Sequence, residues 1–212
     1  MTNRILMLAL AAALCACASK PVEPEWKGDA GSALKNFSDA YLKGESTAAA
    51  SDFAQARMAM TSTGRPDLVA HAELYRCATR AASLEFDDCP GFQALAQDAT
   101  PTEHAYAAYV AGRLEAVNVS LLPEQHRPVV QGKVNLAAIA DPLSRMVAAG
   151  VLFKAGRITP ADIMVATDTA SAQGWRRPLL MWLGVSLKRA QAAGDAGEAA
   201  RLQRRIALAS QP

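Results

Sequence analysis

Proline and glycine punctuate the C-terminal third of the chain at nearly regular intervals. The helical stretches there begin near three prolines and end at three glycines (Pro142, Pro160, Pro178; Gly156, Gly174, Gly194). Proline is tolerated in the first turn of a helix, and glycine readily adopts the left-handed backbone that ends one. The first and last prolines are 36 residues apart, and the first and last glycines are 38 apart. This period is typical of stacked helical hairpins.

Two short stretches in the same region resemble the tetratricopeptide repeat family. They are Leu183-Gly184 and Gly194-Asp195, the latter followed by Glu198-Ala199. They lie about one helical turn further apart than in that family, and the resemblance covers about seventy residues. It implies antiparallel helix hairpins stacked as a repeat-like superhelix, and it implies no particular ligand.

Alanine accounts for 46 of the 212 residues. It is the best helix former and is poor in strands, and small side chains let helices approach closely. Apolar spacing predicts helices over residues 30–44, 50–64, 66–82, 92–96, 101–116, 122–130 and 133–140. No segment alternates as a strand does. We therefore predict an all-α fold forming a single domain over residues 28–212, with a subdivision near residues 100–140 left open.

The first twenty residues have the pattern of a bacterial secretion signal. Arg4 precedes an apolar run over residues 5–16, which is too short to span a bilayer of ~30 Å. The run ends in Leu14-Cys15-Ala16-Cys17, which resembles the lipobox of bacterial lipoproteins. The resemblance implies a signal peptide over residues 1–16 and lipidation of Cys17. An ordinary signal peptide without a lipid is the alternative.

Residues 17–27 contain two prolines and no helical period, so we expect a lipidated tether between the membrane and the fold. By analogy with lipoprotein sorting, Ala18 and Ser19 carry no aspartate retention signal. This favours the outer membrane of a Gram-negative host, with the domain on the periplasmic face. We expect the N-terminal lipid to be the contact with the membrane.

Cys77 and Cys89 remain for other chemistry. An oxidising compartment favours a disulfide between them. Their Cα atoms must approach to ~5.5 Å, so the helix carrying Cys77 has to end near Ser83 or Leu84 before the chain folds back. The sequence Asp87-Asp88-Cys89-Pro90-Gly91 is rich in turn formers. A metal site is the rival, but no histidine pair lies nearby. We expect neither a metal nor a cofactor.

Positive charge gathers in the tail. From Trp175 onward the chain has seven basic and two acidic residues. The predicted partner surface consists of Arg176, Arg177, Arg201, Arg204 and Arg205. Such a surface suits anionic lipid, peptidoglycan carboxylates or an acidic envelope protein. Nucleic acid is not an expected partner in the periplasm, and a solvated basic face is the alternative.

The sequence contains none of the nucleophile-elbow, zinc-protease, phosphate-loop or dinucleotide motifs. We therefore predict a lipoprotein that acts as a protein-interaction or assembly scaffold and is not an enzyme. Two alternatives stay open. One is an envelope enzyme acting on peptidoglycan, for which Glu73, Glu103 and Glu115 are weak candidates. The other is a carrier of a small apolar ligand between helices.

Overall fold

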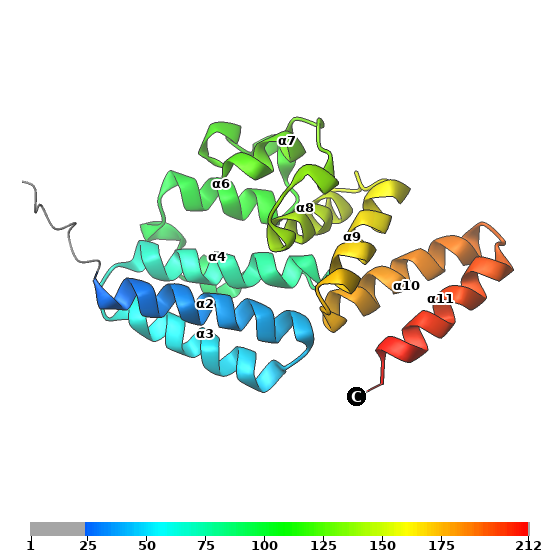
Figure 1. Ribbon diagram of the computed structural model, residues 1–212. Coiled ribbons are helices and arrows are strands. Elements are labelled where there is room, and N and C mark those ends of the chain that lie inside the picture. The colour runs from blue at the N-terminus through cyan, green and yellow to red at the C-terminus, as the bar shows by residue number, and fades with distance from the viewer. Residues whose placement is uncertain (1–23, 212) are drawn as a thin grey trace, which may run out of the picture.

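The computed structural model describes residues 24–211. The predicted signal peptide and lipidation site Cys17 lie outside the described residues, as does residue 212. The described part consists of α-helices and short 3-10 turns, and it contains no strand (Figure 1). The predicted all-α class is confirmed.

Long helices stand at both ends of the chain, and shorter elements connect them. The N-terminal helices are α2 (Glu25–Lys43), α3 (Ser46–Thr61) and α4 (Pro66–Ala82). The middle contains α5 (Pro90–Gln93), η2 (Ala96–Asp98), α6 (Pro101–Val110), η3 (Leu114–Ala116), η4 (Val119–Leu121), η5 (Glu124–His126), α7 (Arg127–Val130) and η6 (Leu136–Ala138). The C-terminal helices are α8 (Pro142–Lys154), α9 (Pro160–Ala172), α10 (Arg176–Ala192) and α11 (Ala196–Ala209).

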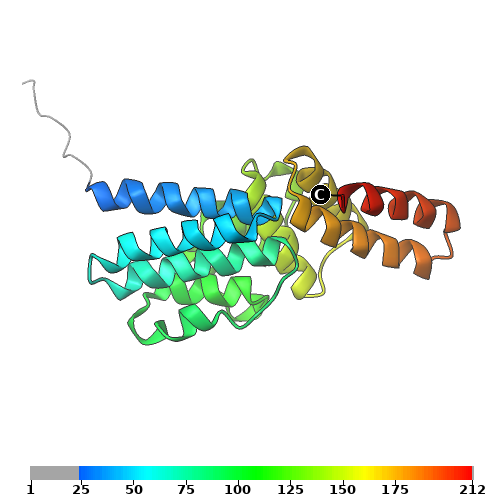
Figure 2. The ribbon, with the colours of Figure 1, turned by 90° about the horizontal axis from the view of Figure 1, so that it is seen from below.

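Helix α4 is the centre of the arrangement. It packs against α2, α3, α6 and α8, while α10 packs against both α9 and α2. From α8 onward, each helix packs on the next one in the sequence. The α10–α11 hairpin projects from the rest of the molecule, as Figures 1 and 2 show from two directions. The fold is thus a helical body with a protruding C-terminal hairpin.

Three groups of apolar side chains hold these helices together. The largest runs through α4, α6, α8, α9 and α10, and includes the fully buried Tyr109, Met146 and Trp182. A second group joins α2, α3 and α4 around Phe37. A third joins α10 and α11 around Leu202. Each group supplies the apolar burial that short helices need to be stable in water.

The C-terminal end of α4 contacts both α8 and α10. A Cβ atom on Gly150 of α8 would lie 2.2 Å from the carbonyl oxygen of Ala81, so the two helices cross with no room for a side chain. The indole of Trp182 on α10 donates a hydrogen bond of 3.1 Å to the carbonyl of Ala82. The two contacts fix α8 and α10 onto the same end of α4.

Left-handed glycines end α6, α8, α9 and α10. At Gly112 φ is 73°, and Arg113 donates its backbone N–H to the carbonyl of Ala108, which closes a Schellman motif. Gly156, Gly174 and Gly194 repeat this geometry, as their spacing predicts. The predicted continuation of α6 to residue 116 is wrong, because Gly112 stops the helix at Val110.

The helices predicted over residues 122–130 and 133–140 are shorter than expected. Only α7 and two 3-10 turns form there. The side chain of Asn135 accepts a hydrogen bond from the backbone N–H of Ala137, which offers the chain an alternative to helical pairing. The left-handed Gly132 separates the two segments.

Candidate functional site

A tight loop closed by a disulfide follows α4. The helix ends at Ala82, and the chain reverses over residues 84–89, here called the disulfide loop. Cys77 and Cys89 form a disulfide, with their Cα atoms 5.9 Å apart. The pairing agrees with the sequence prediction. So does the end of the helix next to Ser83, which that pairing requires.

Both ends of the disulfide loop have unusual backbone. Leu84 has a φ of 57° and Cys89 a φ of 49°, and neither is a glycine. Residues with a Cβ atom avoid this left-handed region because the side chain crowds the backbone. The Asp87 carboxylate helps to hold the turn, since its Oδ1 accepts the Cys89 backbone N–H at 2.9 Å.

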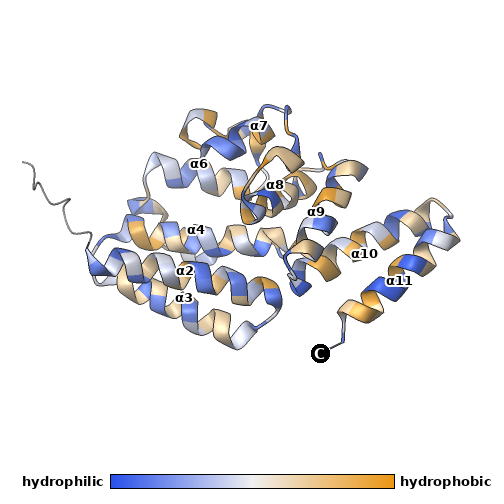
Figure 3. Ribbon diagram, in the orientation of Figure 1, coloured by the Kyte–Doolittle hydropathy of each residue, from blue (hydrophilic) through white to orange (hydrophobic). Residues whose placement is uncertain are grey.

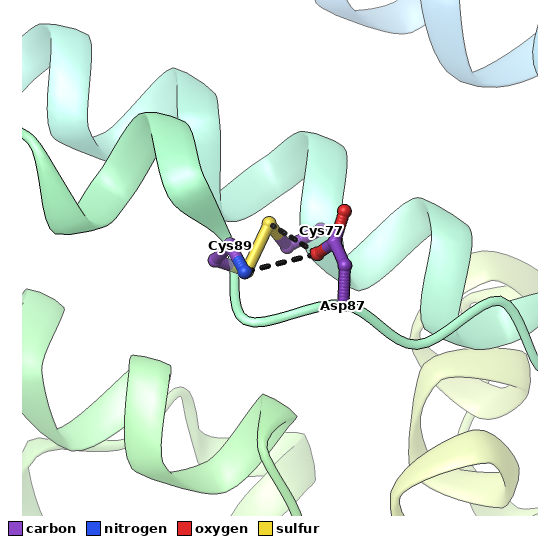
Figure 4. Close-up of side chains that lie close together, drawn as sticks. All are labelled: Cys77, Asp87 and Cys89. Atoms are coloured by element: carbon purple, nitrogen blue, oxygen red, sulfur yellow. Dashed lines mark hydrogen bonds between the residues drawn. A yellow bond between two sulfur atoms is a disulfide. The ribbon is translucent and has the colours of Figure 1, made fainter.

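The same carboxylate lies beside the bridge (Figure 4). Its Oδ1 is 3.9 Å from the Sγ of Cys77, and the ligand-type atoms of Cys77, Asp87 and Cys89 all lie within 4.8 Å of one another. Two thiolates and a carboxylate could ligate a soft divalent metal. In this form, however, the two sulfurs are bonded to each other, so neither is free as a thiolate.

Carboxylates of the loop tie α4 to α10. Asp87 pairs with Arg80, and Glu85 lies 3.3 Å from Nη1 of Arg177. The same Arg177 guanidinium donates to the carbonyl of Tyr41 and to the hydroxyl of Ser46, at 2.7 Å each. One arginine at the start of α10 therefore binds both the disulfide loop and the α2–α3 turn.

An apolar groove runs along one side of the disulfide loop, between the loop, α10 and the α8–α9 connection. It has a volume of about 510 Å³ and opens to solvent. Its walls are Leu84, Phe86, Phe153, Ile158, Ile163, Leu180, Met181, Gly184 and Val185, with Lys188 and Arg189 on the rim. We call this feature the apolar groove.

The groove walls come from distant parts of the chain. Phe86 of the disulfide loop stacks on Phe153 of α8, with ring centroids 6.4 Å apart. The ammonium of Lys154 lies 5.1 Å from the Phe86 ring, which places a positive charge beside the disulfide loop. Met181 of α10 is 42% exposed and forms part of the wall. Apolar and polar residues are interspersed along α10 in Figure 3.

A second hollow, the disulfide cleft, also borders the loop. It has a volume of about 340 Å³, and both bridged cysteines line it together with Asp88, His104 and Lys154. Phe86 lines the groove as well as the cleft. The disulfide loop thus contributes residues to both an apolar hollow and a more polar one.

The five arginines of the predicted partner surface do not share one environment. Arg177 is engaged inside the fold, as described above. Arg176 donates to the carbonyl of Gln211 at 3.2 Å, and Arg201 makes two bonds of 2.6 Å to Glu198. Arg204 is exposed on α11, and Arg205 is half-buried. The predicted partner surface stays a prediction, and Arg177 binds groups within the fold.

The three carboxylates considered for catalysis each have a partner of their own. Glu73 is buried between Arg57, at 3.1 Å, and Arg76, at 2.9 Å. Glu103 caps the start of α6 by accepting the backbone N–H of Thr100. Glu115 is exposed and pairs with Arg157. The structure brings none of them together.

One histidine is buried in the middle of the chain. His126 is 2% exposed, and its Nδ1 is 3.0 Å from the hydroxyl of Tyr109. Burial lowers the pKa of His126 to about 4, and the charge of Asp141 opposes this shift. The histidine is therefore neutral in the folded protein at physiological pH.

Sequence reasoning found the bridge but missed the apolar groove. Its walls are apolar residues from three separate segments, and each of them also fits an ordinary helix or turn. The signal that could have pointed to it is the pair Leu84 and Phe86 within a turn-forming stretch, where large apolar side chains are uncommon.

Comparison with family models, curated proteins and solved structures gives no match to this chain. Among residues 24–211, no helix has the length and apolar character needed to cross a membrane.

Proposed function

We propose that this chain is a lipid-anchored envelope scaffold that binds an acidic, amphipathic segment of a partner protein in the apolar groove. The groove carries the proposal: nine apolar residues line it, and both of its charged lining residues are basic. Binding sites are commonly hollows lined mainly by apolar side chains with a few polar groups, and a positive rim selects a partner with acidic flanks.

The stacking of α8 to α11 supports the scaffold part of the proposal. These four helices pack sequentially and are joined by left-handed glycines. We propose that they form a short superhelix similar to the tetratricopeptide repeat. Helical hairpin stacks present elongated surfaces suited to a segment of another protein. The groove opens to solvent, which favours such a segment over an enclosed small ligand.

The membrane anchor rests on the lipobox alone. We propose that Cys17 carries a lipid that holds the chain at the outer membrane, with the helical domain in the periplasm. Metabolic labelling with a palmitate analogue tests this. The Cys17→Ser variant should lose the label, and the Cys15→Ser variant should keep it. Equal labelling of Cys17→Ser and the unmodified chain would refute the anchor.

The groove is tested with a fluorescent sixteen-residue probe that forms an amphipathic helix with leucine on one face and glutamate on the other. The variant Lys188→Glu/Arg189→Glu reverses the rim charge. We expect it to weaken probe binding about tenfold, which corresponds to ~1.4 kcal/mol. Replacing the probe's glutamates with lysines should weaken binding to the unmodified chain.

Arg204→Glu/Arg205→Glu is the matched control, because it makes the same charge change on α11 and not on the groove rim. We expect this control to change the affinity less than twofold. If it weakens binding as much as the rim variant does, the arginines of α11 are the partner surface and the groove proposal fails. Sedimentation of the probe-free chain tests whether a second copy fills the groove, which would also refute an acidic partner.

A further inference from the structure

We infer that the Cys77–Cys89 bridge is a redox-controlled latch that keeps one wall of the apolar groove in place. This inference rests on the proposed function of the groove and names its regulation. Leu84 and Phe86 belong to the groove wall, and both lie inside the loop that the bridge closes. The position of the wall therefore depends on how firmly the disulfide loop is held.

The backbone at both ends of the loop has an unfavourable conformation. Leu84 and Cys89 occupy the left-handed region, where residues with a Cβ atom are disfavoured. Such conformations persist only where the surroundings impose them, and they cluster at switch regions. At Cys89 those surroundings include the bridge itself, the hydrogen bond of its N–H to Asp87 and the hydrogen bond that its carbonyl accepts from the Gln93 N–H. Loss of the bridge removes the covalent restraint among these.

The bridge is open to a reductant on one side. Cys77 is 4% exposed, whereas Cys89 is half-buried and lines the disulfide cleft. A thiolate of a dithiol reductant can attack the Sγ of Cys89 from this cleft and release Cys77, which takes up a proton. The second thiol of the reductant then displaces Cys89 as a thiol and closes the reductant's own disulfide.

Asp87 is placed to stabilise the reduced form. Its Oδ1 lies 3.9 Å from Cys77 Sγ, which is within hydrogen-bonding distance for a sulfur donor. Once reduced, the Cys77 thiol can donate to this oxygen, which already accepts the Cys89 N–H. Cys89 then loses the covalent link that restrains its left-handed backbone, and only hydrogen bonds still hold it there. The loop relaxes, and Leu84 and Phe86 withdraw from the groove.

The test uses the full chain, oxidised or treated with dithiothreitol, and measures hydrogen exchange by residue. We expect reduction to accelerate exchange over residues 84–93 at least tenfold, with α9 and α11 unchanged. The variant Cys77→Ser/Cys89→Ser should behave as the reduced chain and should not respond to dithiothreitol. If hydrogen exchange accelerates uniformly across the fold, the bridge stabilises the whole protein. If exchange does not accelerate, the loop keeps its conformation without the bridge. Either result overturns the latch.

Binding of the glutamate-rich helical probe gives the second readout. Reduction should weaken it about tenfold in the unmodified chain. The variant Leu84→Ala/Phe86→Ala should bind weakly in both redox states, because its wall is already missing. Equal affinity of the oxidised and reduced unmodified chain would refute the latch. If the oxidised chain does not bind the probe at all, the proposed function fails, while hydrogen exchange still shows whether the loop is released.

Discussion

The helices from Pro142 onward are bounded by capping residues next to them in the sequence, whereas the segment from residue 84 to residue 140 consists of short elements held by individual side chains. In the C-terminal part, Asp141, Thr159 and Asp195 each accept a backbone N–H at the start of a helix. Left-handed glycines end three of those helices. These local contacts satisfy some of the free N–H and C=O groups at the helix ends.

The middle segment lacks long helices and depends on single side chains. Arg145 of α8 donates two hydrogen bonds, of 2.8 and 3.0 Å, to the carbonyl of Ile139, and Arg127 donates one of 2.9 Å to the carbonyl of Leu122. The ring of His126 packs on Tyr109 with centroids 4.9 Å apart. We conclude that the ends of the C-terminal helices are set by nearby residues, whereas the path of the middle segment depends on single side chains.

The largest expected effect comes from a residue of the C-terminal helices that contacts a distant part of the chain. Gly150 lies in α8, within the locally determined part, but its backbone touches α4. Gly150→Ala improves helix propensity, yet its new methyl group would lie 2.2 Å from the carbonyl of Ala81. Overpacking of this kind against backbone should destabilise the protein by about 4 kcal/mol, above the usual range for core insertions. Urea unfolding measures the change.

Gly31→Ala is the control for that variant. Gly31 is exposed in α2, and a Cβ atom added there would have nothing within 4 Å. The substitution should stabilise the protein by about 0.5–1 kcal/mol, the ordinary gain of alanine over glycine in a helix. If Gly150→Ala also stabilises the chain, α8 is not pressed onto α4.

The same distinction explains what the sequence could predict. The all-α class, the helix boundaries at Gly156, Gly174 and Gly194, and the capping box at Thr100 follow from residues within a few positions of one another. The pairing of Cys77 with Cys89 was predictable because the other two cysteines lie within the first seventeen residues, and because turn-forming residues before Cys89 let the chain fold back. Signals of this kind can be found in the sequence because they depend on residues that lie close together along the chain.

The rest depends on contacts between distant residues. The sequence could not indicate that Gly150 meets Ala81, or that Arg177 binds the carbonyl of Tyr41. The apolar groove was missed for the same reason, since Phe86, Phe153 and Val185 come together only after α4, α8 and α10 have packed. Periodicity shows which residues face inward on a helix, but not which other helix they meet.

A pH titration tests the middle segment through His126. Burial lowers its folded-state pKa to about 4, from an ordinary value of 6.5. The unfolded chain therefore binds a proton between these two pH values, and the folded chain does not. The stability linked to this residue is fully present above pH 6.5 and is lost as the pH falls to about 4, by roughly 3 kcal/mol.

His126→Gln isolates that contribution, because glutamine is neutral and can still accept a hydrogen bond from Tyr109. Unfolding free energies of both proteins at several pH values give the difference. We expect the gap between them to narrow as the pH falls from 6.5 to 4, since only the unmodified chain loses this part of its stability. A constant gap across that range would show that His126 titrates equally in the folded and unfolded chain.

The smallest of these effects concerns α11, the last helix of the described residues. α11 packs on α10, and Leu202 is 2% exposed in the small apolar group that joins them. Leu202→Ala shortens the larger of the two buried side chains of α11 and should cost about 2 kcal/mol, at the low end for a buried leucine because a terminal helix can shift to fill the space.

The control is Leu208→Ala in the same helix, where the side chain is 70% exposed and the melting temperature should stay unchanged. Since α11 has its main packing on one neighbour, the loss at Leu202 should be local as well as small. Hydrogen exchange should accelerate over α11 in Leu202→Ala, and the amides of α4 and α8 should keep their original rates. Faster exchange in α4 would contradict this, because it would mean that the hairpin stabilises the central helix. If α11 can detach from α10 while the other helices stay folded, α10 can shift with it. Because α10 forms one wall of the apolar groove, such a shift would change the groove.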